Sequence, residues 1–166
     1  MKKYLTLFIF ACFAISAQAQ KFGYINSQAL LAQSPEIKAA DAELETFQRD
    51  LISKGQTMVT EFEAKYQKYV EEANSGTLSK VQMQNKEATL AQAQQEIQKY
   101  EIQVQNQVLE KRQELYKPIL DRIKVSLDSY AYENGYTMIF DSGAGGLLHA
   151  LPGEDLMEVM KTRLGF

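Results

Sequence analysis

Apolar residues in the middle of the chain recur at intervals of three and four, with a single gap at Lys54. The first set comprises Ile37, Ala40, Leu44, Phe47, Leu51, Met58, Phe62, Tyr66, Tyr69 and Ala73. Mainly Glu, Lys, Gln and Arg separate its members, so the apolar side chains share one face of an α-helix. Ser34 can cap this helix, and Pro35 suits its first position.

A second stripe follows a polar interruption at residues 74–79. Gly76 favours the end of one helix, and Thr77 or Ser79 can cap the next. The second set comprises Met83, Leu90, Ala93, Ile97, Tyr100, Val104, Val108, Leu115, Ile119, Ile123, Leu127 and Tyr130. The short connection predicts an antiparallel helical hairpin over residues 36–134, with its tip near 74–79. The many glutamines of the second helix are typical of a solvated helix face.

Two residues inside the predicted helices disfavour a straight helix. Pro118 lacks a backbone donor, so we expect a kink there, although the apolar stripe continues beyond it. Gly55 weakens a helix by up to about 1 kcal/mol relative to Ala, which makes it either a bending point or a tolerated defect. Asn134–Gly135 is a typical helix stop.

Strand-like stretches occur near both ends of the chain. Phe22–Asn26 reads Phe-Gly-Tyr-Ile-Asn, and Tyr136–Phe140 is rich in aromatic and β-branched residues. Leu147–Leu151 is a further candidate strand, and an amphipathic helix runs through Leu156 to Leu164. Since the first strand has partners only at the other end of the chain, we expect an α+β fold. Its small β-rich body comprises residues 20–35 and 135–166, with the helical hairpin inserted between them.

The first nineteen residues have the features of a secretory leader. Lys2 and Lys3 precede an apolar run from Tyr4 to Ile15, and Ala17–Ala19 offers small residues at the positions a signal peptidase reads. The run is shorter than the roughly 20 residues that a bilayer core requires. We therefore predict cleavage between Ala19 and Gln20 and an exported mature chain.

Cys12, the sole cysteine of the sequence, lies inside this leader. Lipid attachment at Cys12 is an alternative, but Phe10 and Phe13 make a poor lipidation site and the leader would be unusually short. After ordinary cleavage the mature chain has neither a disulfide nor thiol chemistry.

Charge limits the partners of the mature chain. Removal of Lys2 and Lys3 leaves 16 basic against 21 acidic residues, and the net charge moves from −3 to −5. The broad basic surface of a nucleic-acid-binding protein is absent. Short strands with open edges and a small core predict an oligomer instead.

No set of residues favours an enzyme. Asp141-Ser142-Gly143-Ala144 after Ile139 and Phe140 is similar to the signature of dimeric aspartic proteases, but those enzymes are almost entirely β. We interpret Asp141 and its glycines as a turn. His149 is the sole histidine, and there is no Gly-Lys-Ser/Thr phosphate loop, so we expect neither catalysis nor a metal or other cofactor.

The order of these parts resembles the Skp/OmpH family of periplasmic chaperones. The resemblance is carried by the leader, by FGYIN passing into SQALL, by the charged hairpin, by YTMIFD after the Asn-Gly stop and by the terminal DLMEVMKTRL. It implies a periplasmic homotrimer whose bodies join and whose arms enclose unfolded outer-membrane proteins without ATP. Best-known members are basic, whereas this chain is acidic, which argues against contact with lipopolysaccharide or an anionic membrane surface.

Two groups of residues are candidates for these roles. Candidate contacts to the bound protein, where the first stripe becomes larger and softer, are Met58, Phe62, Tyr66 and Tyr69, although the same four can pack against Met83 and Leu90. Candidate oligomerisation residues are Phe22, Tyr24, Ile25, Met138, Ile139 and Phe140. The alternative hypothesis is a coiled-coil spacer or adaptor of the cell envelope with one defined partner, which predicts a tight seam between the helices.

Overall fold

The computed structural model describes residues 20–166, so the predicted leader, its cleavage site and Cys12 lie outside or at the edge of the described residues. The described chain divides into two compact units. One unit, the body, contains residues 20–34 and 121–166, and the other, the arm, contains residues 35–120. No helix among the described residues combines the length and the apolarity needed to cross a membrane.

The arm consists of α3 (Pro35–Asn74) and the first part of α4 (Lys80–Glu133). The helices end and begin where the polar interruption of the sequence predicted. Gly76 at the turn has a φ of 69°, the left-handed conformation that glycine adopts without strain. α4 runs through Pro118 without interruption, and the division between arm and body falls just beyond it, at residues 120 and 121.

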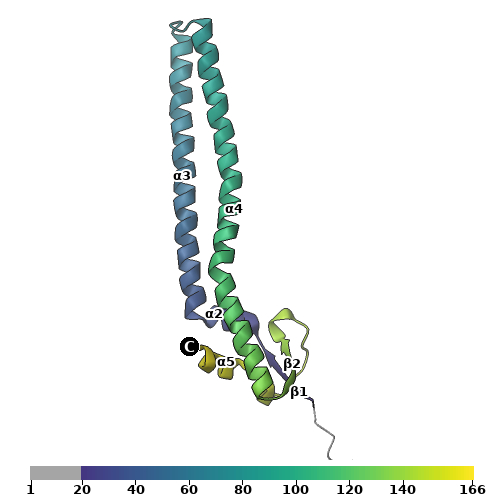
Figure 1. Cartoon of the computed structure of the whole chain (residues 1–166). Helices are drawn as coiled ribbons and strands as arrows, with labels where there is room; N and C mark the ends of the chain where they lie inside the picture. The colour runs from purple at the N-terminus through teal and green to yellow at the C-terminus, as the bar shows by residue number, and fades with distance from the viewer. Residues whose placement is uncertain (1–19) are drawn as a thin grey trace, which may run out of the picture. The chain divides into compact units, whose positions relative to one another are not determined.

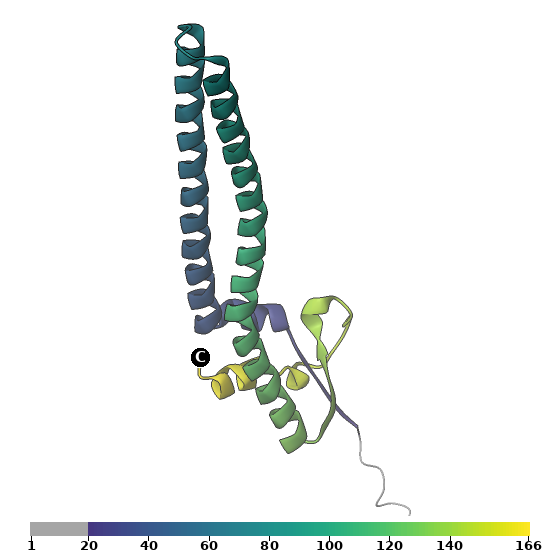
Figure 2. The same cartoon turned by 45° about the horizontal axis from the view of Figure 1, so that its top comes forward.

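Side-chain contacts between α3 and α4 establish that the two helices are antiparallel. Glu43 contacts Lys111, Leu51 contacts Tyr100 and Glu72 contacts Lys86. Residue numbers therefore fall along α4 as they rise along α3, and the helices lie side by side in both views (Figures 1 and 2).

Burial within the arm is uneven. The buried residues of α3 are Ile37, Ala40 and Leu44, and the buried residue of α4 is Tyr100. From Phe47 to Asn74, every α3 residue of the described chain is half-buried or exposed. The apolar stripe is thus covered well at its beginning and only partly beyond it.

The body contains a parallel two-stranded sheet of β1 (Lys21–Ile25) and β2 (Tyr136–Asp141). Phe22 pairs with Met138 and Tyr24 with Phe140, whereas Lys21 pairs with Tyr136 because a bulge at Thr137 shifts the register. A Cβ at Gly23 would lie 2.9 Å from the Tyr136 ring, so glycine is needed for this close approach.

The core of the body lies on one face of the sheet. Its buried residues are Ile25, Leu30, Leu156 and Met160, which come from β1, α2 (Ser27–Gln33), the loop before α5 and α5 (Met157–Leu164). The half-buried residues around them are Ile123, Leu127, Tyr130, Tyr136, Ile139, Met157, Leu164 and Phe166. Each fully buried Leu or Met contributes about 1.5–3 kcal/mol, so this small core depends on few residues.

The prediction of a strand at Leu147–Leu151 is wrong. In the described chain these residues form no regular element and lie between two short 3-10 helices, η1 (Ser142–Ala144) and η2 (Pro152–Glu154). The backbone N–H of Leu156 instead donates to the Tyr24 carbonyl over 2.9 Å, and Tyr24 forms an isolated bridge with Asp155. Asp155 and Leu156, which follow the predicted strand in the chain, therefore cover part of the edge of β1 at Tyr24. The first strand also ends one residue early, because Asn26 caps α2 through the Ala29 N–H.

Candidate functional site

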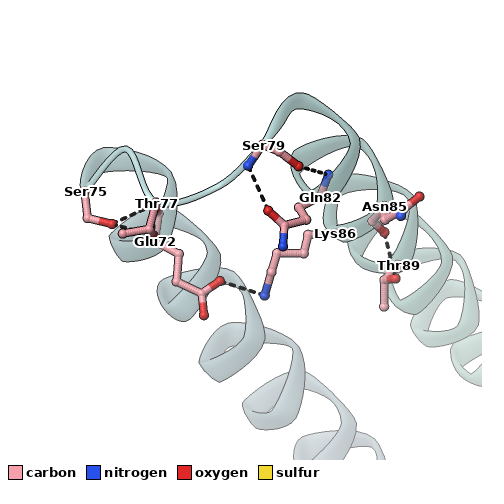
Figure 3. Close-up of polar contacts among 8 residues, drawn as sticks. All are labelled: Glu72, Ser75, Thr77, Ser79, Gln82, Asn85, Lys86 and Thr89. Carbon is pink, nitrogen blue, oxygen red and sulfur yellow. Dashed lines mark hydrogen bonds and ion pairs between the residues drawn. The ribbon is translucent and has the colours of Figure 1, made fainter.

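The tip of the arm is closed by a capping box at the start of α4. The Gln82 side chain accepts from the Ser79 N–H over 2.8 Å, and the Ser79 hydroxyl accepts from the Gln82 N–H over 3.3 Å (Figure 3). At the end of α3, the hydroxyls of Ser75 and Thr77 donate to the Glu72 carbonyl. Residues that the sequence marked as polar loop thus satisfy backbone groups at both helix ends.

An ion pair joins the two helices below this turn. Lys86 Nζ lies 2.7 Å from Glu72 Oε2, and this contact lowers the pKa of Glu72 from its ordinary value (Figure 3). Nearby, the Tyr69 hydroxyl donates to Glu87 Oε1 over 2.5 Å, which raises the pKa of Tyr69. The tip is therefore held by polar contacts rather than by a buried apolar seam.

The four residues predicted to contact a bound protein differ in exposure. Met58, Phe62 and Tyr69 are half-buried, whereas Tyr66 is 47% exposed. The rings of Phe62 and Tyr66 stack with centroids 6.3 Å apart. Of the four, Tyr66 presents the most exposed apolar surface.

Sequence reasoning missed two exposed apolar residues beside this set. Ile52 is 56% exposed and Val59 is 39% exposed. Together with Tyr66 they form a series, Ile52, Val59 and Tyr66, in which successive members are seven residues apart. The three side chains therefore share one side of α3. The spacing can be found in the sequence, but Ile52 and Val59 lie next to the main apolar stripe and were not assigned to it.

A cleft between the helices follows this side of α3. Its volume is about 520 Å³, and its lining residues are Gly55, Gln56, Met58, Val59, Thr60, Ile97, Tyr100 and Glu101. Apolar groups of Met58, Val59 and Ile97 come from both helices, while Gln56 and Glu101 add polar groups. The cleft is thus lined by both apolar and polar groups.

Tyr100 explains the glycine in the middle of α3. A Cβ added at Gly55 would lie 3.3 Å from the Tyr100 ring, which is tight. The Tyr100 hydroxyl donates to the Leu51 carbonyl over 2.9 Å, and Lys54 Nζ lies 5.6 Å from the ring centroid. Gly55 therefore leaves room for a ring that links the two helices.

The six predicted oligomerisation residues divide between the two faces of the sheet. Ile25 is buried in the core, and the half-buried Ile139 packs against it. The exposed members are Phe22 at 36%, Met138 at 53% and Phe140 at 42%, and Tyr24 is half-buried. The Phe22 and Phe140 rings lie 6.2 Å apart, so the exposed members form one apolar face.

Asp141 has a structural position at the end of β2. Its carboxylate accepts from the Ser27 N–H over 3.1 Å, the Ser27 hydroxyl over 2.5 Å and the Gly143 N–H over 2.9 Å. The Ser27 hydroxyl contributes most to a lowered pKa of Asp141. The interpretation of this motif as a turn is confirmed, because Asp141 caps η1.

Metal-binding side chains do not gather in the part of the chain that the structure describes. No group of three or more His, Cys, Asp or Glu residues there is arranged to hold a metal ion. His149 lies in the exposed loop between η1 and η2.

Comparisons with known proteins agree with this architecture. The family model described as outer membrane protein, OmpH-like, matches residues 21–164. A crystal structure from Caulobacter crescentus CB15, named as a candidate OmpH-like outer membrane chaperone, is similar with a TM-score of 0.76. The two chains are 15% identical, and the similarity covers 90% of this chain and 86% of that one. A comparison with curated proteins gave no match.

Proposed function

The chain belongs to the OmpH-like outer membrane protein family, which includes chaperones, and we propose that it is an ATP-independent holdase. In this role it binds unfolded outer-membrane β-barrel proteins, its clients, in the periplasm and prevents their aggregation. Export after cleavage between Ala19 and Gln20 is part of the proposal.

The partial burial of the arm carries this proposal. Beyond Leu44, the described residues of α3 include no buried side chain, although Met58, Phe62 and Tyr66 belong to its apolar stripe. A permanent coiled-coil seam would bury such residues against the facing helix. Apolar groups left half-covered over this length are instead suited to transient contact with a non-native chain.

Weak contacts distributed along the arm suit a holdase better than a single deep pocket would. Clients differ in sequence, and adaptable surfaces that include Met and flexible polar side chains tolerate such differences. Because no single contact dominates, a client can leave without an input of chemical energy.

Association of three copies is also part of the proposal. The sheet has only two strands, and its apolar face of Phe22, Met138 and Phe140 is exposed in one chain. Leu148 is 97% exposed and Leu151 is 62% exposed in the neighbouring loop. Open edges and exposed apolar groups of this kind favour pairing with another copy. The proposed number of copies, three, comes from the resemblance to the Skp/OmpH family.

Complex formation with a denatured client tests the holdase directly. A urea-denatured outer-membrane β-barrel is diluted into buffer that contains residues 20–166 of the protein and no nucleotide, and the mixture is separated by size exclusion. We expect the barrel to co-elute with the protein. If the barrel is found only in aggregates, the holdase proposal is wrong. Cross-linking in cells provides a second test, because a single dominant partner would favour the envelope adaptor instead.

A further inference from the structure

Two clefts line the arm between α3 and α4. Asp50 of one cleft and Val59 of the other lie nine positions apart on α3, which is two and a half helical turns, so the arm has two flanks, one on each side of the seam between the helices. A cleft marks each flank, and their lining residues differ. The first cleft, described above, contains Gln56, Val59 and Ile97. The second, with a volume of about 500 Å³, is lined by Glu43, Thr46, Phe47, Asp50, Gln107, Glu110, Lys111 and Glu114.

The first cleft belongs to what we call the glutamine flank. Residues three, four or seven positions apart share one side of a helix, which extends this flank along both helices. On α3 it has an apolar row of Ile52, Val59 and Tyr66. On α4 it has Gln94, Gln98 and Gln105, which lie seven, three and four positions from Glu101 of the cleft. These six residues present an apolar row beside a row of amides. The ionised groups on this side are Glu101 of the cleft and Glu63, which lies four positions from Val59 and three from Tyr66, so this flank has fewer charges than the other.

The second cleft belongs to what we call the charged flank. On α3, Lys54 lies four positions from Asp50, Glu61 lies seven positions from Lys54, and Lys65 lies four positions from Glu61, so these residues extend this flank along the helix. Lys111 Nζ lies 2.8 Å from Glu43 and 3.3 Å from Glu114, so its ammonium is held between two carboxylates. These contacts raise the pKa of Lys111.

The cost of covering the two flanks differs. Covering the charged flank with a polypeptide would remove water from several ionised groups, which is unfavourable unless each finds a partner. Glutamine side chains have no charge, and each amide can both donate and accept hydrogen bonds. They can therefore satisfy the backbone N–H and C=O groups of an extended chain whatever its sequence.

We propose that the glutamine flank is the surface on which the arm holds its client. The occupant is an extended segment of an unfolded β-barrel protein, in which apolar and polar residues alternate. Its apolar side chains lie on the row of Ile52, Val59 and Tyr66, and its polar edge and backbone face Gln94, Gln98 and Gln105. The charged flank remains in water. This inference rests on the proposed holdase function and assigns it to one side of the arm.

Matched triple variants test the assignment. The first variant combines Ile52→Ser, Val59→Ser and Tyr66→Ser, and its control combines Asp50→Ser, Glu61→Ser and Lys65→Ser at similar heights on the charged flank. We expect the first to weaken the binding of a denatured β-barrel about tenfold or more and the control to change it less than about threefold. The six residues replaced are all exposed, so both variants should retain the helical circular dichroism of the unaltered chain.

A second measurement does not depend on these substitutions. Glu96 lies eleven positions, about three helical turns, before Gln107 of the second cleft, which places it on the charged flank. Residues 20–166 contain no cysteine, so Gln98→Cys and Glu96→Cys each provide a single thiol at nearly the same height on opposite flanks. With a short thiol-reactive cross-linker, we expect Gln98→Cys to capture the client in clear preference to Glu96→Cys.

The possible failures are distinguishable. If the unaltered protein does not bind the client, the holdase proposal itself is wrong. If it binds but the charged-flank variant loses as much affinity as the glutamine-flank variant, or Glu96→Cys cross-links equally well, the assignment to one flank is overturned while the holdase stands.

Discussion

The hydroxyl of Tyr100 donates a 2.9 Å hydrogen bond to the backbone carbonyl of Leu51, which joins the two helices of the arm midway along α3. Tyr100 is the buried residue of α4, at 9% exposure. We predict that Tyr100→Phe lowers the free energy of unfolding of the arm by about 0.5–1.5 kcal/mol, because the ring stays and one hydrogen bond is lost. Urea denaturation followed by circular dichroism measures this loss. Tyr132→Phe, at a position that is 90% exposed, is the control and should change little.

The Tyr100 ring should limit the stability gained by replacing Gly55 with alanine. Alanine in a helix is favoured over glycine by about 0.5–1 kcal/mol, but its Cβ at residue 55 would press on the Tyr100 ring. We therefore predict that Gly55→Ala stabilises the arm in a Tyr100→Ala background and gives less or no gain in the unaltered chain. A double-mutant cycle measures the coupling, and equal effects in both backgrounds would show that the glycine is merely a tolerated defect.

The helical pattern was sufficient to predict the arm but not to explain its details. The stripes ending at Ala73 and beginning at Met83 placed the turn correctly, because helix periodicity and capping residues are local properties. The role of Gly55 could not be predicted from the sequence, because the ring that it accommodates belongs to Tyr100, forty-five residues further along the chain. Periodicity gives the centre of a stripe but not its burial, so the exposure of Ile52 and Val59 was missed.

Strand prediction failed where it depended on a partner. Leu147–Leu151 has strand-like residues, but a strand requires an available edge, and Asp155 and Leu156 lie beside Tyr24. The sequence likewise did not show that Ile25 and Ile139 lie on the side of the sheet that faces the core. Both features depend on long-range contacts that composition does not specify.

The Asp141 carboxylate should contribute to stability at neutral pH and lose that contribution in acid. Its pKa in the folded chain is lowered, mainly by the Ser27 hydroxyl, so folding favours the ionised form. The contribution is present above the unfolded pKa of about 3.9 and disappears as the pH falls through the lower folded value. We predict that Asp141→Ala costs up to about 1 kcal/mol at pH 7, since the group is exposed, and less at pH 2.5.

Urea titrations of both proteins at the two pH values measure this difference. A cost that is equal at pH 7 and pH 2.5 would contradict the role of the charge. Asp141→Ala should bind clients as the unaltered chain does, because the carboxylate has a structural role. The loss of a measurable hydrolytic activity in this variant would instead favour the interpretation as an enzyme.

The capping box at the tip should control local opening. Ser79→Ala removes the hydroxyl that accepts from the Gln82 N–H, at a typical cost of about 1 kcal/mol. We predict faster amide hydrogen exchange over the first turn of α4, by about fivefold, with little change in the global unfolding midpoint. Thr89→Ala, ten residues beyond Ser79 on α4 (Figure 3), is the control and should leave exchange in the first turn of α4 unchanged.

The exposed face of the sheet should be required for association. We predict that Met138→Asp combined with Phe140→Asp converts the proposed oligomer to a monomer, because two charges would then be buried at the contact without partners. Multi-angle light scattering measures the mass. Val125→Asp changes another exposed apolar residue, which lies outside the sheet, and should leave the mass unaltered. A double variant with the mass of the unaltered protein would place the interface elsewhere.

We propose that this chain keeps unfolded β-barrel proteins from aggregating without ATP. The most direct test is light scattering during dilution of a urea-denatured outer-membrane β-barrel into nucleotide-free buffer with residues 20–166 of this protein in molar excess. We predict that scattering stays near the buffer level and rises with the protein omitted or replaced by an equal mass of albumin. Scattering that rises equally with and without the protein would show that the chain is not a holdase for these clients.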